Sequence, residues 1–329
     1  MFHPLSIRLL HIVLLCLLGN PLVGGCQSAD TRPVTNAPAR NEPVRTYTLK
    51  ADHTWQLDAP SKERFDASAL LWTADGKLLT VNDRSSTLYE ILLDEKLTSA
   101  TLQPVPNAFT ATQLAPFKAE KKGRYDCEGI AQDSVGHLYV CEEANRWILR
   151  WDPKTRSVER LPIDWKSVEK YFSPMDSNAS FEGVAIGDRT LYVANERSRG
   201  RIIEVNLDTM QVIGDFSAQI PDEAAYDVHY SDLCWFEGHL YVLLRESWRV
   251  LKVDLARRRT VTVYSFSKME QDPETFYRNP YPTSTMEGLA VDKNYIWLAT
   301  DNNGQPRLKY PNDTRPTLFR CPRPDRTHH

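Results

Sequence analysis

The chain has 329 residues, with 40 Lys and Arg against 43 Asp and Glu, for a formal net charge of −3. This near balance lacks the basic excess typical of nucleic-acid binding, so no nucleic-acid partner is expected. Beyond the N-terminus no apolar run reaches the ~18 residues that a membrane-spanning helix needs.

The first 25 residues are predicted to be a secretion signal. Arg8 supplies a positive charge, Leu9 to Leu18 form a short apolar run, and small residues precede Cys26. A cysteine at this position resembles a bacterial lipoprotein signal, so we expect Cys26 to carry a lipid. The lipid would anchor the exported protein to a membrane, on the periplasmic or the cell-surface side. The alternative is an ordinary signal peptide whose cysteine is incidental.

Three further segments follow this signal. Residues 26–44 begin with Cys26 and are polar and rich in Pro, Asn and Arg, which is typical of a flexible tether. Residues 45–321 carry continuous apolar positions and are predicted to form one large domain. Residues 322–329 are expected to be a disordered tail.

Within the domain a two-strand pattern recurs five times. A polar residue opens an apolar strand, and a second apolar strand begins eight to ten residues later. The openings are 60, 54, 50 and 55 residues apart, and such regular spacing indicates stacked structural repeats. The opening residues are Ser68, Glu128, Glu182, Asp232 and Glu287.

Each copy continues into a third strand, and four copies offer a fourth. Four-stranded sheets repeated about an axis predict an all-β fold, the β-propeller. Five blades are expected, and six are the alternative if a degenerate blade lies in residues 45–66 or 94–124. Residues 45–51 alternate in polarity and are predicted to complete the last blade and close the ring. One short helix is expected at residues 165–172.

The opening residues are predicted to point into the central channel. Four carboxylates around one axis repel each other unless a cation neutralises them. Calcium accepts six to eight oxygen ligands in flexible geometry, whereas zinc prefers His and Cys, which these positions lack. The sequence therefore predicts one axial Ca²⁺ held by the five opening residues. The alternative is that the acids bind backbone amides and arginines and only hold the blades together.

A second polar column follows the second strand of each copy and is predicted on the same face. Within or beside it, Glu143 and Glu196 are candidates to activate water, and Arg84, Arg197 and Arg245 are candidates to bind phosphate. The sequence contains none of the common nucleophile, phosphate-loop or zinc-protease motifs. The column consists of Asp83, Glu143, Glu196, Arg245 and Asp301.

Four cysteines remain after Cys26, and their spacing fits no zinc motif. Cys127 and Cys141 flank one predicted hairpin and are the first candidate disulfide pair. The alternative is that they are small buried apolar residues. The other two are Cys234 and Cys321.

Several motifs resemble the SdiA-regulated family of bacterial propellers and the related esterase-like, phytase-like propeller domains. The matching segments lie between residues 66 and 303 and include Tyr-Asp-Cys-Glu-Gly-Ile-Ala at 125–131 and Met-Glu-Gly-Leu-Ala-Val-Asp at 286–292. Ser68 and the segment 76–84 show a more distant resemblance to calcium-activated apyrases. That resemblance implies five blades and an axial calcium held by serines and glutamates, although Asp232 stands where that family tends to have serine. The dense acidic clusters of the propeller phytases are not expected.

Together these observations predict an exported, calcium-binding β-propeller lipoprotein that binds a small-molecule or protein ligand on its acidic axial face. The alternative is a calcium-dependent phosphoric ester hydrolase, phytase-like or apyrase-like. In that case the metal would polarise phosphoryl oxygens. A third hypothesis is a lactonase- or esterase-type propeller that uses metal-bound water.

Overall fold

The apolar segments of the domain form β-strands. The computed structural model describes residues 43–61, 64–118, 125–176, 179–196, 200–220, 228–280 and 283–326. The predicted signal, Cys26 and most of the predicted tether lie outside these described residues, and so does Arg197. Among the described residues no helix is long and apolar enough to cross a bilayer.

Helix is confined to single turns in the described ranges. The predicted helix at residues 165–172 is reduced to one 3-10 turn. The helical elements are α1 (Ala111–Leu114), α2 (Ser267–Glu270) and the 3-10 turns η1 (Glu169–Tyr171) and η2 (Arg245–Ser247).

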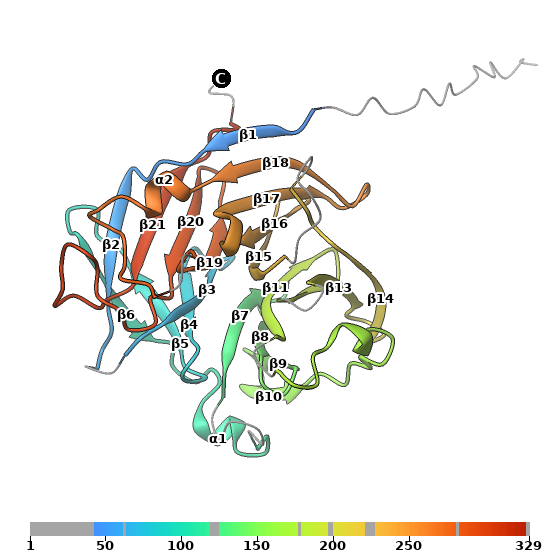
Figure 1. Cartoon of the computed structure of the whole chain (residues 1–329). Coiled ribbons are helices and arrows are strands. Elements are labelled where there is room, and N and C mark those ends of the chain that lie inside the picture. The colour runs from blue at the N-terminus through green and yellow to red at the C-terminus, as the bar shows by residue number, and fades with distance from the viewer. Residues whose placement is uncertain are drawn as a thin grey trace, which may run out of the picture. The chain divides into compact units, whose positions relative to one another are not determined.

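The strands follow the repeats, and each repeat forms an antiparallel sheet in which successive strands are neighbours (Figure 1). The first repeat comprises β3 (Ala67–Trp72), β4 (Leu78–Asn82), β5 (Leu88–Leu92) and β6 (Ser99–Pro104). The second comprises β7 (Cys127–Gln132), β8 (Leu138–Glu142), β9 (Trp147–Asp152) and β10 (Ser157–Arg160). The third comprises β11 (Phe181–Gly187), β12 (Thr190–Asn195), β13 (Arg201–Asn206) and β14 (Gln211–Phe216). The fourth comprises β15 (Tyr230–Phe236), β16 (His239–Leu244), β17 (Arg249–Asp254) and β18 (Arg259–Ser265), and the last comprises β19 (Met286–Val291), β20 (Tyr295–Thr300) and β21 (Thr317–Pro322).

The two N-terminal strands join different sheets, which corrects the predicted closure of the ring. Strand β1 (Arg45–Thr48) pairs in parallel with β18 of the fourth repeat. Strand β2 (His53–Asp58) pairs antiparallel with β21 and supplies the fourth strand of the last repeat. It also pairs in parallel with β6, so the first and last repeats form one eight-stranded sheet. The prediction that residues 45–51 close the last blade was wrong, because alternation of polarity identifies a strand but not its partner.

The opening strands of the repeats surround a common axis. They contact one another in a closed cycle, β3 with β7, β7 with β11, β11 with β15, β15 with β19 and β19 with β3. The hydrophobic core lies between neighbouring sheets, in five clusters of buried side chains that each join two successive repeats. Each sheet therefore buries both faces, which explains why its strands are apolar along most of their length.

Glycine in the repeated Glu-Gly-x-Ala motif allows the inner strands to approach closely at the axis. A Cβ atom at Gly183 would lie 2.7 Å from the Cα atom of Asp232, and one at Gly129 would lie 2.8 Å from the backbone nitrogen of Val184. A backbone cannot move aside as a flexible side chain can, so these positions require glycine. The glycine of the Glu-Gly-x-Ala motif is therefore explained by the close packing of the inner strands around the axis.

Two smaller predictions also differ from the structure. Cys127 packs between the first and second repeats, whereas Cys141 packs between the second and third. They lie on opposite faces of one sheet, and both thiols are free, so the proposed disulfide does not form. The ordered chain also passes residue 321: Arg323 is buried and its Nη2 atom lies 3.2 Å from the Asp325 carboxylate.

Candidate functional site

A β-bulge marks the start of every inner strand. In each repeat the register between the first two strands shifts by one residue, so that an extra residue is left outside the ladder. A bulge redirects the side chain of that extra residue. These five residues, here called the ring residues, are Ser68, Glu128, Glu182, Ser231 and Glu287.

The fourth ring residue is Ser231, and the sequence prediction of Asp232 is off by one position. The bulge lies between Tyr230 and Asp232, so Asp232 is equivalent to the glycine that follows the glutamate in other repeats. The prediction failed because it matched residues by acidity, and a one-residue shift in register changes which residue occupies the bulge.

Asp232 instead joins three inner strands. Its Oδ2 atom accepts hydrogen bonds from the backbone N–H groups of Leu289 on β19, at 2.8 Å, and Leu70 on β3, at 3.3 Å. Its Oδ1 atom accepts a hydrogen bond from Leu233 N at 2.8 Å. Because β3 does not neighbour β15 in the cycle, the carboxylate spans the axis. This arrangement matches the structural alternative for the acids, in which a carboxylate holds inner strands together.

Two overlapping groups of acids lie beside the ring. Carboxylate oxygens of Asp66, Asp83 and Asp301 lie within 4.8 Å of one another, and so do those of Asp83, Asp126 and Glu128. Asp83 belongs to both groups. The expectation that no dense acidic cluster would occur was therefore wrong.

Sequence reasoning named Asp83, Glu128 and Asp301 for this face but missed Asp66 and Asp126. Each missed residue stands two positions before a ring residue. Side chains two positions apart lie on the same face of a strand, so this spacing was the signal that could have found them. Here the end of the inner strands that carries the ring residues, both acid groups, Glu143 and Glu196 is called the acidic face.

Burial and mutual repulsion raise the pKa values of several carboxyls on the acidic face. Burial is the largest cause of the raised pKa of Glu128, followed by the charges of Glu143 and Asp126. Burial likewise raises the pKa of Glu182, with Glu196 as the next cause. The pKa of Asp301 is raised by burial and then by Asp66 and Asp83. These groups are therefore ready to bind either protons or a cation.

Arg245 neutralises one side of the acidic face. Its Nη2 atom donates a hydrogen bond to Glu196 Oε1 at 2.9 Å, and its Nη1 atom forms an ion pair with Glu287. Arg245 occupies the position at which the other repeats carry Asp or Glu. The proposed base Glu196 and the proposed phosphate ligand Arg245 therefore bind each other.

Arginine is also present beside the first acid group. Arg64 Nε lies 2.5 Å from Asp66 Oδ2, and Arg64 Nη2 donates a hydrogen bond to Asn303. Arg84 is exposed and lines a polar cavity of about 520 Å³ together with Arg64 and Ser85. At this cavity the predicted phosphate ligand Arg84 adjoins a second guanidinium group, that of Arg64.

Two ring hydroxyls lack hydrogen bonds within the described residues. Ser68 and Ser231 are each 1% exposed, and their Oγ atoms have no hydrogen-bond partner there. A buried hydroxyl without a partner is destabilising, by about 1–3 kcal/mol. A hard cation beside either hydroxyl would take its oxygen as a ligand. Among the described residues, Glu128 is the ring residue that belongs to an acid group, while Glu287 forms an ion pair with Arg245.

Solved structures that align with this chain share little sequence with it. The glutaminyl cyclase of Myxococcus xanthus aligns with a TM-score of 0.56 at 14% identity, over 85% of this chain and 97% of the cyclase. The WD40 repeats of RRP9 align with a TM-score of 0.40 at 10% identity, over 83% of this chain and 99% of that chain. At 14% identity the likeness to the cyclase shows a propeller-type fold and carries no information on activity.

Sequence comparison gives the family. No curated protein matches the sequence. The segment matched by a family model includes the inner strands of all five repeats and begins at Asp66, a member of the first acid group. The chain belongs to the phytase-like family, which is described by the esterase-like activity of phytase and whose model matches residues 66–304.

Proposed function

We propose that this protein is a five-bladed, calcium-binding β-propeller that binds a ligand on its acidic face. The observation that carries the proposal is the pair of acid groups that share Asp83, since one oxygen of each member lies within 4.8 Å of the others. Such spacing is close enough for the members of a group to share one cation. The two unpartnered ring hydroxyls, on Ser68 and Ser231, support the same interpretation.

Calcium is the ion that fits these donors. They are carboxylate and hydroxyl oxygens, and the members of the acid groups come from different repeats rather than from one tight loop. Calcium tolerates such irregular sets, while magnesium needs a near-ideal octahedron and zinc favours nitrogen and sulfur. Serine at the fourth ring position also agrees with the apyrase resemblance, which implies serines and glutamates around an axial calcium.

Five blades are proposed because five inner strands contact one another in a closed cycle. Export and lipidation at Cys26 are proposed on the residues of the N-terminal segment alone. Together these features describe a ligand-binding or catalytic domain held at a membrane by a lipid.

Calcium titration of the chain lacking residues 1–26 tests the proposal. Calcium at about 100 times its Kd should stabilise the fold by about 2.7 kcal/mol and raise Tm by about 5–10 °C. Asp83→Asn should remove most of this rise, because Asp83 belongs to both acid groups. Asp208→Asn, at an exposed ion pair with Arg189, is the matched control and should keep it. No calcium binding by calorimetry, or an Asp83→Asn variant that responds like the control, would overturn the proposal.

A second candidate function is calcium-dependent hydrolysis of phosphoric esters, and the family description favours it. Bound calcium would polarise a phosphoryl oxygen. Glu143, which is buried and whose charge raises the pKa of Glu128, would accept a proton from the attacking water. Arg84 would bind the phosphate at the polar cavity that it shares with Arg64.

Assays with p-nitrophenyl phosphate and phytate test this second function. Activity should depend on calcium, Glu143→Gln should lower kcat by about 100-fold or more, and Arg84→Ala should mainly raise KM. Glu196→Gln should have a smaller effect on kcat than Glu143→Gln, because Glu196 is bound to Arg245. Activity that persists in metal-free buffer, or an unchanged kcat in Glu143→Gln, would exclude this mechanism.

A further inference from the structure

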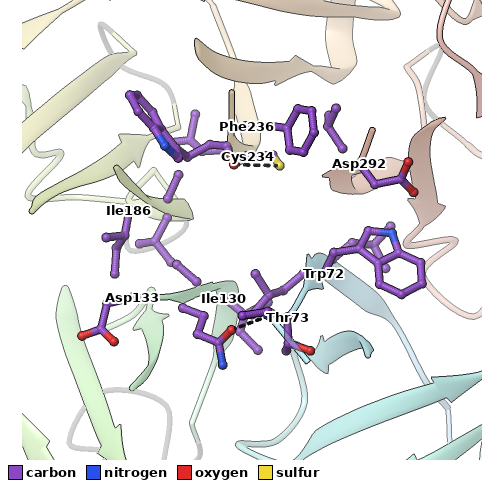
Figure 2. A pocket seen from close by; sticks show the side chains of 18 of the residues that line it. Trp72, Thr73, Ile130, Asp133, Ile186, Cys234, Phe236 and Asp292 are labelled. Atoms are coloured by element: carbon purple, nitrogen blue, oxygen red, sulfur yellow. Dashed lines mark hydrogen bonds between the residues drawn. The ribbon is translucent and has the colours of Figure 1, made fainter. Parts of the chain in front are cut away.

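The far end of the inner strands, opposite the acidic face, encloses an apolar cavity of about 610 Å³. Its lining residues follow the ring residues by two to six positions and come from all five inner strands and the turns after them. Figure 2 shows Ile130, Ile186 and Cys234 on different sides of the central space, while the carboxylates of Asp133 and Asp292 point outward from it. The aliphatic lining residues include Leu70, Leu71, Ile130, Val184, Ile186, Leu233 and Val291.

Three polar groups of this lining have partners within the protein, while the indole nitrogen of Trp72 is buried without a hydrogen-bond partner among the described residues. Gln132 Oε1 accepts a hydrogen bond from Ala74 N at 2.9 Å. Asp133 Oδ2 accepts one from the Tyr139 hydroxyl at 2.9 Å. Asp292 Oδ2 accepts one from the Trp297 indole at 2.6 Å. These three groups therefore do not depend on a ligand for their hydrogen bonds, and most of what remains for a ligand is hydrocarbon surface, with the single N–H donor of Trp72.

No Lys, Arg or His is among the residues that line the cavity, and Arg323, whose guanidinium group lies over the Phe236 ring, is paired with Asp325. Burial raises the pKa of the Cys234 thiol to about 12, so the thiol is neutral at physiological pH. The acidic side chains of the lining are those of Asp133 and Asp292, which disfavour an anion. An anionic ligand would lose its hydration and gain no cation here.

The inner end of the cavity is closed by the contacts of Asp232. The backbone N–H groups of Leu70 and Leu233, two of the lining residues, donate to the buried Asp232 carboxylate. This carboxylate therefore lies directly beneath the lining and separates the cavity from the acidic face. The cavity is a blind pocket, of a volume typical of small-molecule sites.

We propose that this pocket binds a small, uncharged ligand that is mainly hydrocarbon. The site is distinct from the metal and phosphate sites of the proposed function, because it lies at the other end of the inner strands and offers neither a cation nor free oxygen ligands. A rigid apolar pocket of this kind would select by size and by the absence of charge.

Binding of the neutral fluorescent probe N-phenyl-1-naphthylamine to the chain lacking residues 1–26 tests the proposal. Trp72 and Trp235 line the pocket, so bound probe should quench tryptophan emission in a saturable way, with one probe per chain. Ile186→Trp on β11 should fill the pocket and weaken binding about tenfold or more, a change of about 1.4 kcal/mol. The matched control is Ile213→Trp on β14 of the same sheet, where Ile213 is 57% exposed and the affinity should not change.

Three results would overturn the proposal. One is that Ile186→Trp and Ile213→Trp lower the probe affinity equally, or that neither variant lowers it. If Ile186→Trp does not fold, Cys234→Trp on β15 replaces it in this comparison. Another is binding that requires calcium or is lost in Asp83→Asn, which would put the probe on the acidic face. The last is competition by dodecanoate that is as strong as competition by dodecanol, since an uncharged pocket should prefer the alcohol. Retained binding in metal-free buffer would support the pocket even if the proposed calcium site failed its own test.

Discussion

Replacing Asp232 with alanine should destabilise the fold whether or not calcium is bound. The change removes the acceptor for three backbone N–H groups and leaves those of Leu70 and Leu289 buried without partners. Each buried donor that loses its partner costs about 1–3 kcal/mol, so the free energy of unfolding should fall by about 3–5 kcal/mol. For a domain of this size Tm should then fall by roughly 6–15 °C.

Thermal and urea denaturation followed by circular dichroism measure this effect, in metal-free buffer and at saturating calcium. Asp208→Ala is the control, because the exposed Asp208–Arg189 pair should contribute less than about 1 kcal/mol. The Asp232→Ala loss should be the same in both buffers, since Ser231 rather than Asp232 is the ring residue. A loss below about 1 kcal/mol, or one seen only with calcium present, would refute the assignment of Asp232 as a link between strands.

Three further outcomes are expected. First, the raised pKa values on the acidic face mean that the folded state holds more protons than the unfolded chain above pH 4–5. The free energy of unfolding without metal should therefore fall as the pH rises from 5 to 8, and bound calcium should reduce that fall. Thermal melts at each pH measure both effects. Second, Arg245→Ala leaves buried carboxylates without their cation and should lower stability by about 3 kcal/mol at pH 8 and by less at pH 5, measured by urea denaturation. Third, Gly183→Ala would push a Cβ atom against the backbone of Asp232 and should lower Tm strongly, whereas Gly214→Ala meets only side-chain ends and should not, a contrast that thermal melts can check.

The repeat spacing was sufficient to predict the architecture but not the pairing of the chain ends. Regular spacing locates each inner strand because every repeat must bury the same faces, and the strands indeed begin close to the predicted openings. The partner of a terminal strand depends on contacts with residues far away in sequence. Strands β1 and β2 both alternate in polarity, and only the fold distinguishes the one that pairs with β18 from the one that pairs with β21.

The sequence was sufficient to predict which face of the domain carries the acidic residues. It was not sufficient to predict each residue that belongs to the candidate site. The face was found because it collects the first residues of five equivalent strands. The fourth ring residue was missed because a bulge inserts one residue, and nothing in the pair Ser231-Asp232 says which of them is inserted. Asp66 and Asp126 were missed because neither belongs to the two polar columns from which the face was predicted. Each acid group joins two repeats, Asp301 with Asp66 and Asp83 in one and Asp83 with Asp126 and Glu128 in the other.

Strand β2 has a consequence for how the molecule is made. Its partner β21 is the last strand of the domain and far away in the sequence, whereas its other partner β6 follows within the next few dozen residues. During synthesis β2 can pair with β6 first. Its other edge then stays unpaired until β21 has been made. Contacts between segments so far apart in the chain form slowly. Closure is therefore the step at which an incomplete or damaged chain remains open, with an exposed strand edge that invites pairing with a second copy.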